Sequence, residues 1–220
     1  MPTSTVEDYI KTLYVEQQRV PNELVALGKL AAAMGVVPGT VTTMVRTLAE
    51  AGLVRYEPRV GVGLSEQGEK LALHVLRRHR LVELFLVEVL KFDWTEVHPE
   101  AEELEHAISD KLLEKMDEFL GRPTVDPHGD PIPSATGEIE RRDLRPLSRC
   151  RAAERLRIAR VDNQDAAFLQ YATDHGLRPG AIVTVVTADP VAGAITLRNS
   201  DGQLTALGLI AAEAIFASPA

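Results

Sequence analysis

The chain has 220 residues, 45% hydrophobic and 25% charged, a composition typical of globular proteins and a length sufficient for one to three domains. Its formal net charge of −8 excludes indiscriminate binding of nucleic acid through total charge. The sequence has no run of about 18 apolar residues and no signal-peptide pattern, so we expect a cytoplasmic protein with no membrane partner. The single cysteine, Cys150, excludes an intrachain disulfide and a multi-cysteine metal site.

The charge is distributed unevenly along the chain. Residues 91–120 contain ten acidic residues and three lysines, a net charge of −7, whereas residues 1–60 contain six acidic and six basic residues. Residues 141–160 contain eight arginines and two acidic residues. A local surface that faces DNA is therefore compatible with the negative total.

Helical patterns dominate the first fifty residues. Ser4 and Glu7 have the spacing of a capping box that begins a first helix. A second helical segment lies between Pro21 and Gly35, and a third begins at Pro38 and ends near residue 52.

Two short strands are expected next, at residues 53–57 and 60–65, around a turn at Pro58–Arg59. Two helices joined by a tight glycine turn and followed by a β-hairpin have the order of a winged helix-turn-helix. Small and hydroxyl side chains let the second helix approach phosphates and base edges, and arginines neutralise phosphates. A helical hairpin with a solvated polar face is the alternative. The candidate DNA-binding residues are Pro38, Gly39, Thr40, Thr42, Thr43, Arg46 and Arg59.

A long helix is expected from Ser65 to about residue 90. Its apolar surface is broader than one short neighbour can cover, which favours a homodimer. His79 and Glu83 lie four residues apart on this helix, a spacing that suits two metal ligands but is more often a surface hydrogen bond. His74 and His128 have no such neighbour in the sequence, and we interpret both as structural.

The stretch HPEAEELEH places four glutamates between two histidines. Pro99 suits the first position of a helix, which puts His98 at or near the N-cap. His98, Glu102 and His106 then share one helix face, with Glu105 beside them. An acidic first turn that complements the helix dipole is the alternative, but it does not explain the histidines. Carboxylates and imidazoles without a thiolate favour Mn(II) or Fe(II) over structural Zn(II).

The rest of the chain alternates between irregular and regular segments. A helix at residues 110–120 is followed by an irregular, proline-rich segment at residues 121–138. Residues 164–176 have a helical pattern, and three strands are expected within residues 181–208. The last segment is a small β-rich domain, too short for an enzyme active site of its own.

These motifs resemble the diphtheria toxin repressor and manganese transport regulator family of metal-activated transcription regulators. The resemblance is dense up to about residue 135, and the C-terminal segment looks like the SH3-like (FeoA-like) domain of the longer members. The matching stretches are EDYIKTLY (7–14), VPGTVTTMVRTLAEAGLV (37–54), LSEQGEKLA (64–72), RRHRLVELFL (77–86), VHPEAEELEHAISD (97–110) and PHGDPIP (127–133).

The resemblance implies a mainly α fold with small β parts. The implied domains are an N-terminal winged helix-turn-helix DNA-binding domain (1–70), a helical metal-binding and dimerisation domain (71–135), a linker (136–150) and a C-terminal SH3-like β domain (151–220).

The resemblance also implies two metal sites in each subunit. Iron-type members have methionine and cysteine where this chain has Asp8 and Glu102, as the manganese type does, so we expect Mn(II), with Fe(II) as the alternative. Lys11 replaces a further carboxylate of the manganese type, so a close manganese pair is not expected. The implied primary site contains Asp8, Glu102, Glu105 and His106, and the ancillary site contains His79, Glu83 and His98, with Asp162 and Asp165 as candidate ligands from the SH3-like domain.

The implied function is that of a metal-activated transcriptional regulator, usually a repressor, of metal-ion homeostasis. Its partners are double-stranded operator DNA and a second copy of the chain, with no small-molecule substrate. A metal that joins the first helix to the dimerisation helices couples metal binding to DNA binding, typically by about 1–3 kcal/mol. The alternatives are a carboxylate-bridged metalloenzyme, which does not explain the helix-turn-helix, and a structural or metal-storing dimer that has lost DNA binding.

Overall fold

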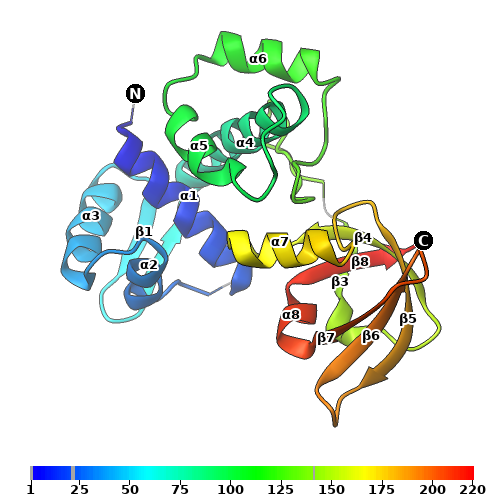
Figure 1. Cartoon of the computed structure of the whole chain (residues 1–220). Helices are drawn as coiled ribbons and strands as arrows, with labels where there is room; N and C mark the ends of the chain where they lie inside the picture. The colour runs from blue at the N-terminus through cyan, green and yellow to red at the C-terminus, as the bar shows by residue number, and fades with distance from the viewer. Residues whose placement is uncertain (1, 21–22, 141) are drawn as a thin grey trace. The chain divides into compact units, whose positions relative to one another are not determined.

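The computed structural model describes residues 2–20, 23–140 and 142–220. They form two units (Figure 1), of which the first contains residues 1–78 and 133–138 and the second contains residues 79–132 and 139–220. Two residues used above, Pro21 and the first arginine of the arginine-rich stretch, lie outside the described residues. No helix within the described ranges combines the length and apolarity needed to cross a membrane.

The first unit is a winged helix-turn-helix, as predicted. Gly35 and Gly52 adopt the left-handed backbone (φ +64° and +73°) just after the second and third helices, and Pro38 is the first residue of the third. Thr3 caps the first helix with its side chain, so the capping box predicted at Ser4 is wrong by one residue. The elements are α1 (Ser4–Arg19), α2 (Leu27–Ala33), α3 (Pro38–Glu50), β1 (Val54–Glu57), β2 (Gly61–Leu64) and the first part of α4 (Glu66–Glu88).

The helical part of the second unit contains the rest of α4, α5 (Val97–Leu104) and α6 (Asp110–Phe119). The N-cap of α5 is Glu96, so His98 lies in the first turn of the helix, near the N-cap as predicted, and Pro99 is the third helical residue and not the first. The helix ends at residue 104, so Glu105 and His106 lie in the following turn and not on the predicted continuous helix face.

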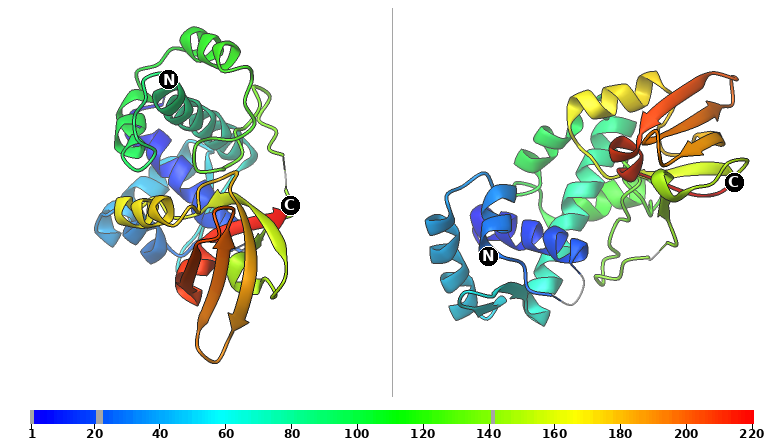
Figure 2. Two further views of the ribbon diagram at one scale, coloured as in Figure 1. Left: turned by 45° about the vertical axis from the view of Figure 1, so that its right-hand side comes forward. Right: turned by 90° about the horizontal axis from the view of Figure 1, so that it is seen from below.

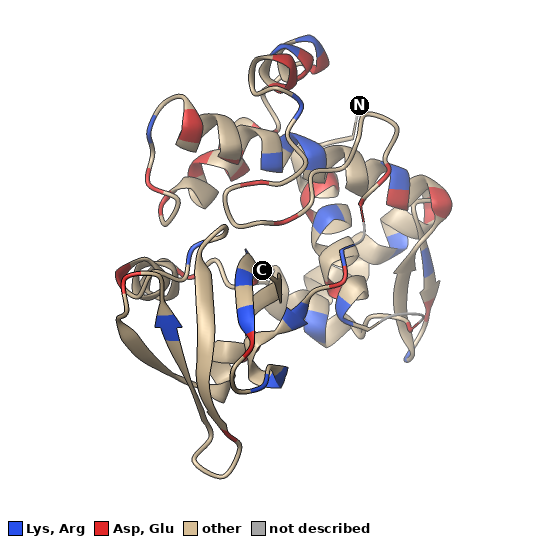
Figure 3. Cartoon of the chain, turned by 90° about the vertical axis from the view of Figure 1, so that its right-hand side faces the viewer, with Lys and Arg blue, Asp and Glu red and all other residues tan. Residues whose placement is uncertain are grey.

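The second unit also contains a six-stranded antiparallel sheet in the order β3-β8-β4-β5-β6-β7. Apolar residues that alternate along β4 to β7 form its core together with α7, which lies beside the sheet (Figure 2). Basic residues of the arginine-rich stretch lie on strands near the C-terminus (Figure 3). The elements are β3 (Arg145–Pro146), a 3-10 turn (Leu147–Arg149), β4 (Arg155–Val161), α7 (Ala166–Asp174), β5 (Ile182–Asp189), β6 (Ala194–Asn199), β7 (Leu204–Gly208), α8 (Leu209–Glu213) and β8 (Ile215–Pro219).

Candidate metal centre

Three side chains of α4 and α5 form a compact donor triangle in the second unit. His79 and Glu83 lie one turn apart on α4, and His98 lies on α5. His79 Nε2 is 3.0 Å from Glu83 Oε1 and 3.1 Å from His98 Nδ1, and His98 Nδ1 is 3.1 Å from Glu83 Oε1. His79 and Glu83 are buried, and His98 is partly buried.

The edges of this donor triangle fit a six-coordinate ion. An octahedral ion with bonds of about 2.1 Å holds neighbouring donors about 3.0 Å apart, whereas a tetrahedral ion with the same bonds holds them about 3.4 Å apart. The three edges of 3.0–3.1 Å match one face of the octahedron. His79, Glu83 and His98 therefore fit Mn(II) or Fe(II), the ions that carboxylate and imidazole donors favour.

Glu105 orients His79 from the side opposite the donor triangle. Its Oε2 lies 2.6 Å from His79 Nδ1, and its side chain is fully buried. With a cation in the triangle, the Nδ1 proton of His79 would be donated to Glu105 and the lone pair of Nε2 would face the ion, the usual arrangement of a ligating histidine. Glu105 Oε1 lies 3.5 Å from His106 Nε2, so one carboxylate contacts both histidines.

Glu102 lies at the more exposed edge of the same cluster. Its Oε1 is 3.4 Å from His79 Nδ1 and 3.6 Å from His98 Nε2, and its side chain is 37% exposed. Glu102, Glu105 and His106 thus lie in the second unit close to the donor triangle. Asp8 lies on α1 in the first unit, so the primary site of four residues remains a proposal. Lys11 is buried on the same helix.

A second buried cluster contains Glu83, Asp126 and His128. One donor atom of each lies within 4.8 Å of the others, and all three side chains are buried. Glu83 Oε2, Asp126 Oδ2 and His128 Nδ1 have no hydrogen-bond partner among the described residues. Unpartnered buried polar atoms are costly, so their convergence indicates a site for a cation or an ordered water. Glu83 belongs to both clusters, with Oε1 directed to the first and Oε2 to the second.

This second cluster was not predicted from the sequence. His128 was interpreted as structural, whereas in the structure His128 Nδ1 lies 3.7 Å from Glu83 Oε2. A signal was present in the Asp126-x-His128 spacing, but no helical periodicity connects it to α4. Asp126 Oδ1 accepts the backbone N–H groups of His128 (2.8 Å) and Asp130 (2.9 Å), which forms a tight turn. The other oxygen, Oδ2, faces the cluster and also lies 3.7 Å from Arg80 Nε, whose charge compensates part of the charge of Asp126.

Burial and charge shift the pKa values of the second cluster. Burial raises the pKa of Asp126, and the carboxylates of Asp130 and Glu83 raise it further, to about 7. Burial also acts to raise the pKa of Glu83, but the charge of His79 and the surrounding imidazoles hold it well below its ordinary value. Burial lowers the pKa of His128, but Glu83, Asp126 and the carbonyl oxygen of Trp94 together raise it, so the net pKa is raised. A cation that binds here therefore displaces protons.

The two candidate ligands from the sheet domain differ in their surroundings. Asp162 follows Val161, whose backbone N–H donates to the carbonyl oxygen of His128 (2.9 Å), so Asp162 lies next to the turn of the second cluster. Its carboxylate is 3.7 Å from Arg160. Asp165 caps α7 by accepting the backbone N–H of Phe168 (3.0 Å), so this carboxylate already has a local role.

The candidate DNA-binding residues lie along α3, from its first residue to Arg46, and in the hairpin turn. Thr42 and Thr43 donate their hydroxyl groups to the carbonyl oxygens of Pro38 and Gly39, at 3.0 and 3.2 Å. Arg59 adopts a left-handed backbone (φ +69°) in the β1–β2 turn. Pro38, Gly39, Thr40, Thr43, Arg46 and Arg59 are exposed, and Thr42 is partly buried.

Comparison with known proteins agrees with this arrangement. The chain matches the N-terminal DNA-binding domain of iron dependent repressors at residues 1–62, their metal-binding and dimerisation domain at residues 65–134, and the FeoA domain at residues 145–219. The diphtheria toxin repressor of Corynebacterium efficiens is 31% identical over 197 residues, which cover 83% of each chain.

Two further relatives connect the chain to iron and to manganese regulators. The iron-dependent repressor IdeR of Mycobacterium tuberculosis is 35% identical over 129 residues, which cover 59% of this chain and about half (55%) of that protein. A solved manganese-dependent transcriptional repressor in complex with manganese is 38% identical, with a TM-score of 0.90 and coverage of 98% of this chain and 100% of that chain. The chain therefore belongs to the family of metal-dependent transcriptional repressors that includes the diphtheria toxin repressor.

Proposed function

We propose that the chain is a Mn(II)-activated repressor of metal-ion homeostasis genes in the cytoplasm, which binds operator DNA as a homodimer and has no enzymatic activity. The observation that carries this proposal is the pair of donor clusters that share Glu83, in a chain that also contains a winged helix-turn-helix.

The proposed ligands use oxygen and nitrogen donors alone. His79, Glu83 and His98 hold one cation, and Asp8, Glu102, Glu105 and His106 hold another, which makes two sites in each subunit. Glu83, Asp126 and His128 are a further candidate set, with Asp162 and Asp165 of the sheet domain as candidate additional ligands. The lack of a thiolate among these ligands supports Mn(II) or Fe(II) over structural Zn(II). Fe(II) is the alternative activator.

The metal supplies a positive charge that holds the acidic and imidazole groups together. The chain itself supplies the linkage, because Asp8 lies on α1 of the DNA-binding unit and the other ligands lie in the second unit. A cation bound by both sets of residues restricts the orientation of α3. The coupling expected is about 1–3 kcal/mol per site, or about 5- to 150-fold in DNA affinity.

Capture of sheared genomic DNA from the source organism tests this function. The purified protein is incubated with Mn(II), with anaerobic Fe(II), or with chelator. We expect a few palindromic sites to be enriched with metal and not with chelator, because two reading helices of a dimer contact two half-sites. Stronger enrichment with Mn(II) than with Fe(II) supports the manganese assignment.

A matched pair of variants completes the test. His98→Ala removes a proposed ligand, whereas His175→Ala removes a histidine at the end of α7 that bonds to Tyr171 and belongs to neither cluster. We expect only the first to lose metal-dependent enrichment. Equal recovery of DNA with metal and with chelator contradicts the proposed function.

A further inference from the structure

Trp94 is the only tryptophan of the chain and lies against the second donor cluster. It follows α4 in sequence, is 1% exposed, and packs in the core of the C-terminal sheet domain. Its indole ring stacks on His128, with ring centroids 5.4 Å apart and an angle of 29° between the planes. Its carbonyl oxygen lies 3.0 Å from His128 Nε2.

This contact determines how His128 faces the cluster. Because Nε2–H donates to the carbonyl oxygen of Trp94, Nδ1 is directed towards Glu83 and Asp126. The stacked indole also prevents rotation of the imidazole ring. The backbone carbonyl of Trp94 thus orients the imidazole of His128, just as the carboxylate of Glu105 orients that of His79.

The other side of the indole is bonded to the C-terminal domain. Trp94 Nε1–H donates to Thr173 Oγ1 on α7 (2.8 Å), and Thr173 in turn donates to the carbonyl oxygen of Leu169 (3.0 Å). The guanidinium of Arg178 lies 4.8 Å from the centroid of the indole ring. A displacement of α7 therefore acts on the indole that holds His128.

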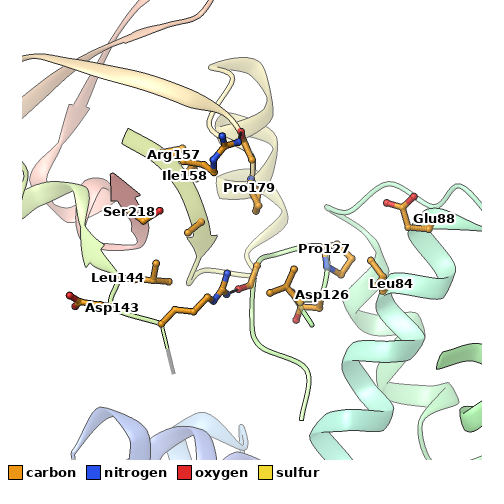
Figure 4. Close-up of a pocket in the computed structure, with 15 residues that line it drawn as sticks. Leu84, Glu88, Asp126, Pro127, Asp143, Leu144, Arg157, Ile158, Pro179 and Ser218 are labelled. Carbon is orange, nitrogen blue, oxygen red and sulfur yellow. Dashed lines mark hydrogen bonds between the residues drawn. The ribbon is translucent and has the colours of Figure 1, made fainter. Parts of the chain in front are cut away.

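The turn that carries His128 also docks directly on β4. The backbone N–H of Val161 donates to the carbonyl oxygen of His128 (2.9 Å). Gly129 has φ +88°, and a Cβ placed on it would lie 2.0 Å from the carbonyl oxygen of Ala159, so only glycine allows this approach. Figure 4 shows Asp126 and Pro127 of this turn between Leu84 of α4 and Ile158 of β4.

We propose that Trp94 is a positioning residue for His128, and that it couples cation binding by Glu83, Asp126 and His128 to the docking of the C-terminal domain. The coupling rests on the proposed metal-dependent function. It is reciprocal, so a bound cation stabilises the contact of Trp94 with α7, and that contact strengthens cation binding. The C-terminal domain is thereby a structural part of the metal centre even where it supplies no ligand.

The single tryptophan provides a readout that needs no DNA. Full-length protein is freed of metal and titrated with Mn(II), with excitation at about 295 nm to select Trp94 and with calorimetry in parallel. We expect the fluorescence to change in step with binding. His128→Ala should abolish the change, whereas His98→Ala should retain it, because the indole stacks on His128 and His98 belongs to the other cluster.

Thr173→Val tests the link to the C-terminal domain with a small change of shape. It removes the hydrogen bond to the indole and should weaken Mn(II) binding by the second cluster about 3- to 10-fold. Thr196→Val, on the partly exposed side of β6, is the matched control and should bind Mn(II) with the affinity of the unchanged protein.

The outcomes separate this inference from the proposed function. Mn(II) binding by calorimetry without a change in fluorescence, or unchanged affinity in Thr173→Val, overturns the role of Trp94 and leaves metal-dependent DNA binding intact. A fluorescence change that survives His128→Ala and disappears in His98→Ala also overturns it. Absence of Mn(II) binding in the unchanged protein overturns both proposals.

Discussion

Glu83 is the residue on which both donor clusters depend. Its side chain is fully buried, with one oxygen 3.0 Å from His79 Nε2 and the other 3.7 Å from His128 Nδ1. A carboxylate with so little contact with water is retained only where positive charge or hydrogen bonds compensate for its desolvation. The surrounding imidazoles do so here, and the cation expected at either cluster does so more strongly.

Glu83→Gln should weaken metal binding at both clusters at once. Glutamine keeps the shape of the side chain but lacks the negative charge, so we expect a loss of about 10- to 100-fold or more at each cluster. Calorimetric titration with Mn(II) measures this, with Glu88→Gln, an exposed position further along α4, as the control. Loss of one binding event with the other unchanged would show that Glu83 is not shared.

Some residues of the centre could be predicted from the sequence, and others could not. His79 and Glu83 were candidates because they lie four residues apart on one helix face, and the family resemblance, not the spacing, implied that they are ligands. Asp126 and His128 were not predicted as part of the centre because they lie on a turn about forty residues later in the chain. Only the tertiary fold brings this turn to α4. Local spacing carries no information about such contacts.

At the scale of elements, proline and glycine at helix ends gave accurate helix boundaries, whereas strongly charged segments gave wrong boundaries or concealed a strand. Pro38 and Gly52 were correctly identified as the limits of α3 because a proline and a left-handed glycine act on the backbone directly. The acidic run after His98 suggested a longer helix than α5, which ends at Leu104. β4 alternates arginines with buried Leu156 and Ile158, a strand pattern that its high charge concealed.

Gly129→Ala should undock the proline-rich turn from β4. The added Cβ would meet the carbonyl oxygen of Ala159 at 2.0 Å, and the backbone angle of φ +88° is itself strained for alanine. We expect a loss of roughly 1–3 kcal/mol in the free energy of unfolding, measured by urea denaturation, together with weaker Mn(II) binding.

Gly202→Ala is the matched control for this change. Gly202 has a similar angle of φ +82°, but no atom lies within 4 Å of the position of an added Cβ. Gly202→Ala should lower the free energy of unfolding through backbone strain alone and leave the Mn(II) affinity unchanged. Equal effects of the two substitutions on stability and on metal affinity would mean that the contact of Gly129 with β4 does not position the metal-binding turn.

At the scale of the whole molecule, the DNA-binding residues and the donor clusters of His79, Glu83, His98, Asp126 and His128 belong to different units. Linkage then requires that the metal act on DNA affinity through the orientation of α3 and not through contact with DNA. The converse also holds, since DNA must raise metal affinity by the same factor. A substitution on the exposed side of α3 therefore separates the two binding reactions.

Arg46→Ala should weaken operator binding and leave Mn(II) affinity of the free protein unchanged. Arg46 is exposed on α3, where a phosphate contact would contribute to affinity for any DNA sequence and to its salt dependence. We expect the slope of log K against log salt to fall by about 1 per subunit in fluorescence-anisotropy titrations at several salt concentrations. Arg198→Ala, an exposed arginine of β6, is the control. An unchanged slope would remove Arg46 from the DNA interface, and a loss of Mn(II) affinity in the free protein would show that α3 supports the metal centre directly.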